Sequence, residues 1–173
     1  EEYYAALRNR LTAVKIGTGF SELDARLTEG LAPGNMSVIA ARPGMGKSAL
    51  GANIIRHLSR QGIQSLWLTY EMTAVSQMDR LVAIEAGLPL TAILRLKDMD
   101  EEKQELIFHT VERIKTWPII LDDRRVVYWR DVLAALTRSQ RDADVRVVFV
   151  DLFDKLADFE GPDQAHIMSR KLQ

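Results

Sequence analysis

A glycine-rich segment, residues 41–48, has the composition of a phosphate-binding loop and reads Ala-Arg-Pro-Gly-Met-Gly-Lys-Ser. An apolar run, Met36 to Ala40, precedes it and a helical pattern, Ala49 to Arg60, follows it, which is the strand–loop–helix context of a P-loop. Glycines let consecutive backbone N–H groups face an anion, and the helix adds its own free N–H groups and positive dipole end. The residues expected to bind nucleotide are Ala41, Arg42, Pro43, Gly44, Met45, Gly46, Lys47, Ser48 and Ala49.

Two side chains of this loop have distinct expected roles. Lys47 would reach the β- and γ-phosphates of ATP, and the Ser48 hydroxyl would ligate Mg²⁺. The first glycine of the usual motif is replaced by Ala41, whose methyl group is tolerable where a strand ends. The structural alternative is a glycine-rich surface turn that happens to precede Lys-Ser, and the flanking strand and helix patterns argue against it.

Hydrolysis of a bound nucleotide also requires acidic side chains. Asp151 ends the β-branched run Val145 to Val150, a Walker B pattern, and is expected to hold the Mg²⁺ shell. Glu71 follows the run Ser65 to Tyr70 and would face the γ-phosphate, because open parallel sheets bind ligands at the carboxyl ends of their strands. Asp151 could instead cap the next turn, and Glu71 could be a surface residue at the start of a loop. The position of Glu71 alone does not decide between this role and catalysis.

Other chemically versatile residues are expected to be structural. Asp122 and Asp123 end a short strand and would orient an arginine or lysine, or begin the next turn. The three histidines lack metal-binding spacing, the three tryptophans lie in or beside apolar patterns, and the Arg124-Arg125 pair is too short to indicate nucleic-acid binding. These histidines and tryptophans are His57, His109, His166, Trp67, Trp117 and Trp129.

The elements that position these residues alternate between strand and helix. Strands are expected at 36–40, 65–70, 118–123 and 145–151, and helices at 1–11, 22–27, 48–60, 75–87, 98–117, 129–140 and after 163. Ser21 is the expected N-cap of the helix at 22–27, with Asp24 as its capping-box acid. This alternation predicts an α/β fold with a parallel sheet and helices on both faces.

Composition restricts the possible classes of protein. The 173 residues are 47% hydrophobic and 27% charged, which suits a globular domain with one core. No apolar run approaches the roughly 20 residues of a membrane span, and no signal peptide is visible. The absence of cysteine excludes disulfides and thiolate metal sites and fits a cytoplasmic protein. The net charge of -1 carries no nucleic-acid signal. The sequence begins without Met and stops within a helical pattern, so we expect it to be a fragment.

Several segments together resemble the C-terminal motor domain of DnaB-type replicative helicases, which has a RecA-like fold. The resemblance extends from Ile16 to Arg170, and the loop at 41–48 matches that family more specifically than a generic P-loop. The other matching segments are Gly17-Thr18-Gly19-Phe20 with Leu23-Asp24, Gly30-Leu31-Ala32-Pro33-Gly34, Glu71-Met72-Thr73 with Arg80-Leu81, Asp122-Asp123, Val150-Asp151 and Ile167-Met168-Ser169-Arg170.

The resemblance implies a function and a set of roles. Lys47 and Glu71 would be the catalytic residues, with Glu71 activating the attacking water, and Ser48 and Asp151 would hold Mg²⁺. Family members form hexameric rings that use ATP to move along single-stranded DNA and unwind duplex, with an arginine from the neighbouring subunit completing each site. Primase and a helicase loader are implied partners. Residues 1–15 would be a linker helix and residues 16–173 a RecA-like ATPase domain, truncated after the Walker B strand.

One segment departs from the family pattern. The family continues Tyr-Leu-Gln-Leu after the Walker B aspartate, whereas this chain has Leu152-Phe153-Asp154-Lys155. Asp154 would place an acid where the family has a glutamine that senses the γ-phosphate. Two alternatives therefore stay open: a recombinase-type or clock-type RecA-like ATPase that does not unwind DNA, and a non-hydrolysing module that assembles when it binds nucleotide.

Overall fold

The computed structural model describes Tyr4 and residues 14–28, 30–124 and 128–151. The chain divides into two compact units, residues 1–58 and residues 59–173, and the boundary falls within helix α3 (Lys47–Arg60). Each unit is described by itself. Apart from Tyr4, the helix expected at 1–11 lies outside the described residues, as do the last expected helix, His166 and Asp154.

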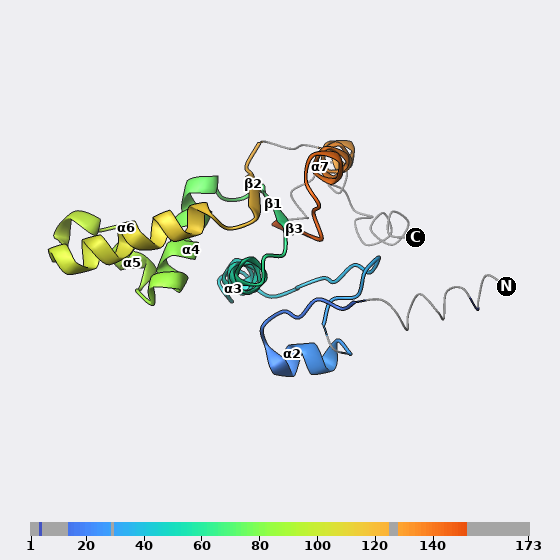
Figure 1. The fold of residues 1–173 in the computed structure, drawn as a ribbon, viewed down its shortest axis with the longest axis horizontal. Coiled ribbons are helices and arrows are strands. Elements are labelled where there is room, and N and C mark those ends of the chain that lie inside the picture. Colours follow the sequence, from blue (N-terminus) through green and yellow to red (C-terminus); the bar gives the residue numbers. More distant parts are fainter. Residues whose placement is uncertain (1–3, 5–13, 29, 125–127, 152–173) are drawn as a thin grey trace. The chain divides into compact units, whose positions relative to one another are not determined.

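The second unit contains a parallel three-stranded sheet (Figure 1). Its strands are β1 (Ser65–Thr69), β2 (Ile119–Asp122) and β3 (Val147–Asp151), in the order β2-β1-β3. All five residues of β1 are buried, as expected for a central strand that is covered on both faces. The parallel α/β architecture expected for this part of the chain is confirmed.

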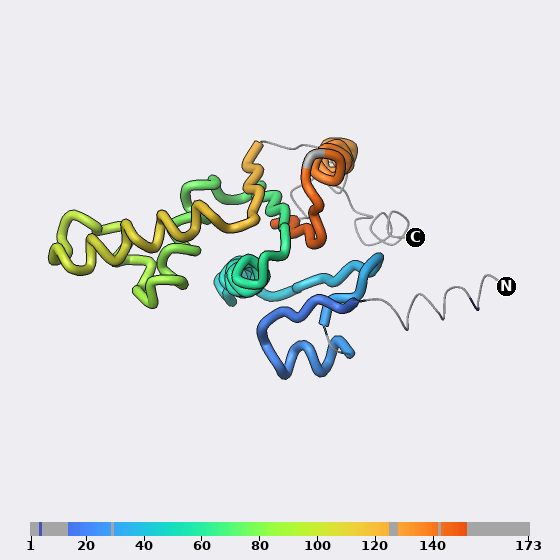
Figure 2. Tube along the Cα trace, viewed as in Figure 1, coloured from blue at the N-terminus to red at the C-terminus, as the bar shows by residue number. Residues whose placement is uncertain are grey.

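Helices α4 (Ala74–Ala86), α5 (Leu90–Ile93), α6 (Glu101–Lys115) and α7 (Trp129–Asp142) accompany the sheet. The Cα trace shows α4 and α6 running side by side (Figure 2). On one face of β1, Leu66 and Leu68 form a core cluster with Val132 and Ala135 of α7. The α4 helix begins at an N-cap, Thr73, and ends at a glycine in the left-handed conformation, so local capping signals define both of its ends.

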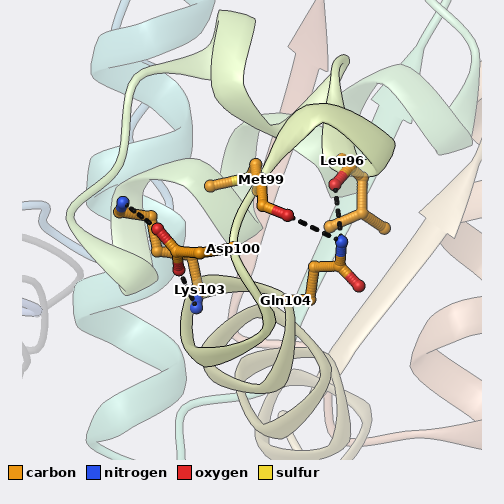
Figure 3. A network of polar contacts seen from close by, with 5 residues as sticks. All are labelled: Leu96, Met99, Asp100, Lys103 and Gln104. Carbon is orange, nitrogen blue, oxygen red and sulfur yellow. Dashed lines mark hydrogen bonds and ion pairs between the residues drawn. The ribbon is translucent and has the colours of Figure 1, made fainter.

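A short 3₁₀ turn, η1 (Leu96–Asp98), leads into α6, which begins later than the expected residue 98 (Figure 3). Asp100 is the N-cap, and its Oδ1 accepts a hydrogen bond from the Lys103 backbone N–H at 2.9 Å. The amide of Gln104 donates to the carbonyls of Leu96 (3.3 Å) and Met99 (3.0 Å). These bonds satisfy backbone groups of the turn, so this amide has a purely local structural role.

In the first unit, α2 (Ser21–Arg26) differs from the expected helix at its start. The N-cap is Phe20, without a side-chain bond, so the expectation that Ser21 caps the helix is wrong. Asp24 instead accepts from the Thr18 backbone N–H (2.8 Å) and hydroxyl (2.7 Å). Burial opposes ionisation of Asp24, but these hydrogen bonds outweigh it and lower its pKa. A carboxylate that accepts two bonds outside the helix is not available as a capping-box acid.

The strand expected at 36–40 is not formed, which corrects the sequence interpretation. Met36, Val38 and Ile39 are 54%, 71% and 43% exposed. A strand requires a neighbour that pairs with its N–H and C=O groups, and the described strands β2-β1-β3 do not include this segment. Apolar β-branched composition alone is therefore insufficient for strand formation at this position.

Within the described ranges, no helix has both the length and the apolar character that crossing a membrane would demand.

Candidate nucleotide-binding site

Two glycines of the glycine-rich loop adopt the left-handed backbone conformation. Gly44 and Gly46 have φ values of +79° and +89°, in the left-handed region, and residues 41–46 are exposed. A Cβ at either glycine would meet nothing within 4 Å, so glycine is needed here for backbone conformation rather than for space. Helix α3 begins directly after the loop, and the Leu50 N–H donates to the Gly46 carbonyl at 2.9 Å.

The start of α3 has the electrostatic character of an anion site. Its first turn contains no acidic residue, so the positive end of the helix dipole is not neutralised by its own side chains. Lys47 is the first helical residue, and its Nζ lies 3.4 Å from the Ala41 carbonyl, which places the ammonium group back over the loop. Ser48 follows, half-buried, in the same first turn. Two left-handed glycines followed by a helix that begins with Lys47 and Ser48 are compatible with the expected P-loop, whereas the expected strand before the loop is not formed.

The second unit brings the two expected acids to one edge of the sheet. Thr69 and Asp151 are register partners at the carboxyl ends of β1 and β3, and the Tyr70 N–H donates to the Asp151 carbonyl at 2.6 Å. Glu71 follows immediately and is exposed. Glu71 and Asp151 therefore share the edge at which parallel sheets bind ligands. Lys47 and Ser48 belong to the first unit.

A buried amide that the sequence analysis did not identify contacts Asp151. Gln77 of α4 is fully buried, and its Nε2 donates to Asp151 Oδ2 (3.3 Å) and to Thr69 Oγ1 (3.4 Å). Its Oε1 accepts from Arg80 Nη1 at 2.9 Å. The available signal was a glutamine four residues before Leu81, on the buried stripe of a helix, because a polar side chain in such a position needs partners.

The second acidic pair has the structural role favoured by the sequence. Asp122 pairs with Arg124, whose Nε donates to Oδ1 at 2.8 Å, and this hydrogen bond lowers the pKa of Asp122. Asp123 Oδ2 accepts from the Ala74 N–H at 2.8 Å, at the N-terminus of α4. Nearby, burial and the charges of Asp122 and Asp131 raise the pKa of the Tyr70 phenol to about 12. Tyr70 therefore stays neutral at physiological pH.

The donor chemistry of the expected residues fits magnesium. Among the described residues, no group of three or more histidines, cysteines or acids could hold a metal by itself. Mg²⁺ does not need such a cage, since it is held by one or two protein oxygens together with phosphates and water. The hydroxyl of Ser48 and the carboxylate of Asp151, described here each within its own unit, offer oxygen donors of the kind that Mg²⁺ prefers. His57 contacts the Gly19 turn, and Trp67 is 1% exposed in the core, which are positions typical of structural side chains.

The sequence matches a protein-family model and several characterised proteins. The model of the DnaB-like helicase C terminal domain family matches residues 15–172. The replicative DNA helicase DnaB of Leifsonia xyli is 31% identical over 137 residues, which are 79% of this chain and 30% of that protein. DnaB of Treponema pallidum is 30% identical over 149 residues, 83% and 33% of the two chains. The DNA repair protein RadA of Haemophilus influenzae is 27% identical over 161 residues, 86% and 34%. The chain spans about a third of the length of these relatives.

Solved structures confirm the fold. A DnaB-like replicative helicase, studied with its interactions with primase, superposes with a TM-score of 0.81 at 23% identity, over 92% of this chain and 39% of that one. A second solved structure, an isolated ATPase domain, gives 0.82 at 21% identity, over 98% and 62%. The expected RecA-like α/β architecture is thus confirmed, and the family model covers nearly all residues of the sequence. The chain belongs to the DnaB-like helicase C-terminal domain family.

Proposed function

We propose that this chain is the ATPase motor of a replicative DNA helicase, which hydrolyses ATP to move along single-stranded DNA and separate the duplex. The observation that carries the proposal is the family match over residues 15–172. The matched range includes the glycine-rich loop with two left-handed glycines and a following helix without an acidic residue in its first turn. The motor would work in the cytoplasm as a ring of copies, with a hexamer expected. Primase and a helicase loader are proposed partners.

The proposal assigns roles to four side chains. Lys47 binds the β- and γ-phosphates, since its ammonium group lies over the loop. Ser48 and Asp151 supply oxygens for Mg²⁺, which when bound neutralises charge that develops on the phosphates during transfer. Glu71 activates the attacking water, as an exposed carboxylate at the ligand-binding edge of the sheet. The remaining P-loop residues contribute backbone N–H groups.

The test is ATP hydrolysis with and without single-stranded DNA, measured on the longest natural form of this chain. Lys47→Ala should abolish turnover and weaken ATP binding, whereas Lys115→Ala, at an exposed lysine of α6, should leave both unchanged. Glu71→Gln should retain ATP binding and lose turnover, with Glu105→Gln on α6 as its matched control. Normal hydrolysis by Glu71→Gln would show that Glu71 is not the base. ATP turnover that single-stranded DNA leaves unchanged would contradict the proposal of a DNA-coupled motor.

A second candidate is a RecA-like ATPase that does not unwind DNA, of recombinase or clock type. It is favoured by the similarity to the DNA repair protein RadA, at 27% identity over 86% of this chain. A forked-duplex unwinding assay separates it from the helicase: DNA-stimulated ATPase without strand separation would support it. A non-hydrolysing assembly module would instead show stabilisation by ATP, roughly 2.7 kcal/mol at 100 times the dissociation constant, without any turnover.

A further inference from the structure

We propose that Gln77 is the positioning residue of the magnesium site: its side-chain amide orients the Asp151 carboxylate and joins it to the turn that carries Glu71. This inference rests on the proposed function, because it presumes that Asp151 acts on Mg²⁺. Gln77 itself would contact neither metal nor nucleotide. Its importance comes from the three side chains that it links at the carboxyl edge of the sheet.

The orientation of the amide follows from the chemistry of its neighbours. Arg80 has only hydrogen-bond donors, so the group 2.9 Å from its Nη1 must be the oxygen Oε1 of Gln77. The amide nitrogen then faces the sheet, where Asp151 Oδ2 accepts at 3.3 Å. An ionised carboxylate has no proton to donate, and an amide N–H is the group that it requires. Arg80 thus ensures that a donor, not an acceptor, faces the acid.

The same amide reaches the turn after β1. Its nitrogen lies 3.4 Å from the Thr69 hydroxyl, which donates to the Met72 carbonyl at 2.6 Å. Arg80 lies 3.3 Å from the Met72 sulfur, so this turn is held from two sides. Glu71 immediately precedes Met72. The network therefore sets the backbone of the Glu71 turn and the plane of the Asp151 carboxylate together.

Burial makes this arrangement rigid and sensitive to substitution. Gln77 is 0% exposed and Thr69 is 1% exposed, so water cannot easily replace a lost partner. Groups that orient metal ligands through hydrogen bonds typically change metal affinity by 10- to 100-fold when they are replaced. The bond to Asp151 spans 74 residues of sequence, so local helix structure alone does not explain it.

The test measures Mg²⁺ binding rather than turnover. A fluorescent, non-hydrolysable ATP analogue is bound to the longest natural form of the chain in EDTA, and Mg²⁺ is then titrated. Gln77→Met keeps the length of the side chain and removes its hydrogen bonds. We expect its Mg²⁺ affinity to fall about 10-fold, with nucleotide affinity in EDTA unchanged. The matched control is Gln104→Met on α6, which loses the two hydrogen bonds that its amide nitrogen donates, as Gln77→Met loses those to Asp151 and Thr69, but should bind Mg²⁺ normally (Figure 3).

Each outcome decides the inference. A folded Gln77→Met protein with normal Mg²⁺ affinity would overturn it, as would an equal loss in Gln104→Met. If Gln77→Met does not fold, Gln77→Glu is measured in its place. This variant can still accept a hydrogen bond from Arg80, but it turns an acceptor towards Asp151. Normal Mg²⁺ affinity of Gln77→Glu would also refute the positioning role of Gln77. Wild-type protein whose nucleotide binding ignores Mg²⁺ would instead refute the proposed function, which separates the two failures.

Discussion

A buried carboxylate between two arginines provides the most quantitative test of how the helices of the second unit are held together. Glu85 of α4 has a side chain that is 0% exposed. Its Oε1 lies 3.2 Å from Arg60 Nη2, at the end of α3, and 3.1 Å from Arg113 Nη2 of α6. The two arginine side chains are 53% and 52% exposed. One buried negative charge therefore holds two half-exposed positive charges from different helices.

The burial asymmetry determines the expected energies. At 3.1 Å and an effective dielectric constant of about 20, each pair attracts by about 5 kcal/mol before solvation is counted. Removing one arginine leaves the carboxylate paired with the other, and the expected loss of stability is about 1 kcal/mol. Removing both leaves a buried charge without either ion pair, which costs about 3–5 kcal/mol.

The experiment is a double-mutant cycle with Arg60→Gln and Arg113→Gln, repeated in a Glu85→Gln background. Urea unfolding at pH 7 is followed by tryptophan fluorescence, because Trp67 is fully buried in β1. The double variant should lose about 2 kcal/mol more than the sum of the two single variants. In the Glu85→Gln background both arginine substitutions should change stability by less than about 0.5 kcal/mol. Additive losses of stability in the protein that retains Glu85, or equal losses with Glu85 and with Gln at position 85, would refute the reasoning.

Two further predictions concern the first unit. Gly19→Ala should destabilise the chain by more than about 1 kcal/mol, because φ is +86° and the new Cβ would lie 2.6 Å from the Cγ of His57. Gly51→Ala, inside α3 and with open space around its Cβ, should stabilise the chain by about 0.5–1 kcal/mol. A Gly19→Ala protein that is more stable in urea than Gly51→Ala would contradict this. The pKa of Asp24 lies below its ordinary value of 3.8, since burial raises it but the hydrogen bonds from Thr18 outweigh burial, so its contribution to stability is present above about pH 4 and is lost as the pH falls through the folded-state pKa. Asp24→Asn should therefore reduce the loss of stability between about pH 5 and about pH 2, and unchanged pH dependence would contradict this.

Elements whose determinants are local were predicted well from the sequence. Helix α4 has an apolar stripe between Thr73 and a C-terminal glycine, and the predicted start at residue 75 differs from the observed Ala74 by one residue. Strand β1 was predicted from a continuous apolar run, which matches its complete burial. In each case the periodicity and the end signals lie within the segment itself, so no distant residue is needed to interpret them.

Features that depend on distant partners were predicted poorly. The run at 36–40 has the composition of a strand, but pairing decides strand formation and composition does not reveal the pairing. Ser21 has the right type for an N-cap, but the loop before it already engages Asp24 through Thr18. Gln77 was not predicted as a site residue, because its contact with Asp151 joins positions that are 74 residues apart in the sequence. Sequence patterns pointed to the acids that are proposed for the site but not to the amide that contacts one of them.

The two groups of expected site residues therefore differ in what maintains their geometry. The proposed phosphate-binding loop depends on left-handed glycines and on the first turn of α3, which are local features of an exposed segment. Substitution of Lys47 there should change ligand binding with little effect on folding. Asp151 depends on a buried network that is built from two strands and a helix. Substitution of Gln77 should change stability and metal binding together, so the Mg²⁺ titration in a folded variant is needed to distinguish positioning from packing.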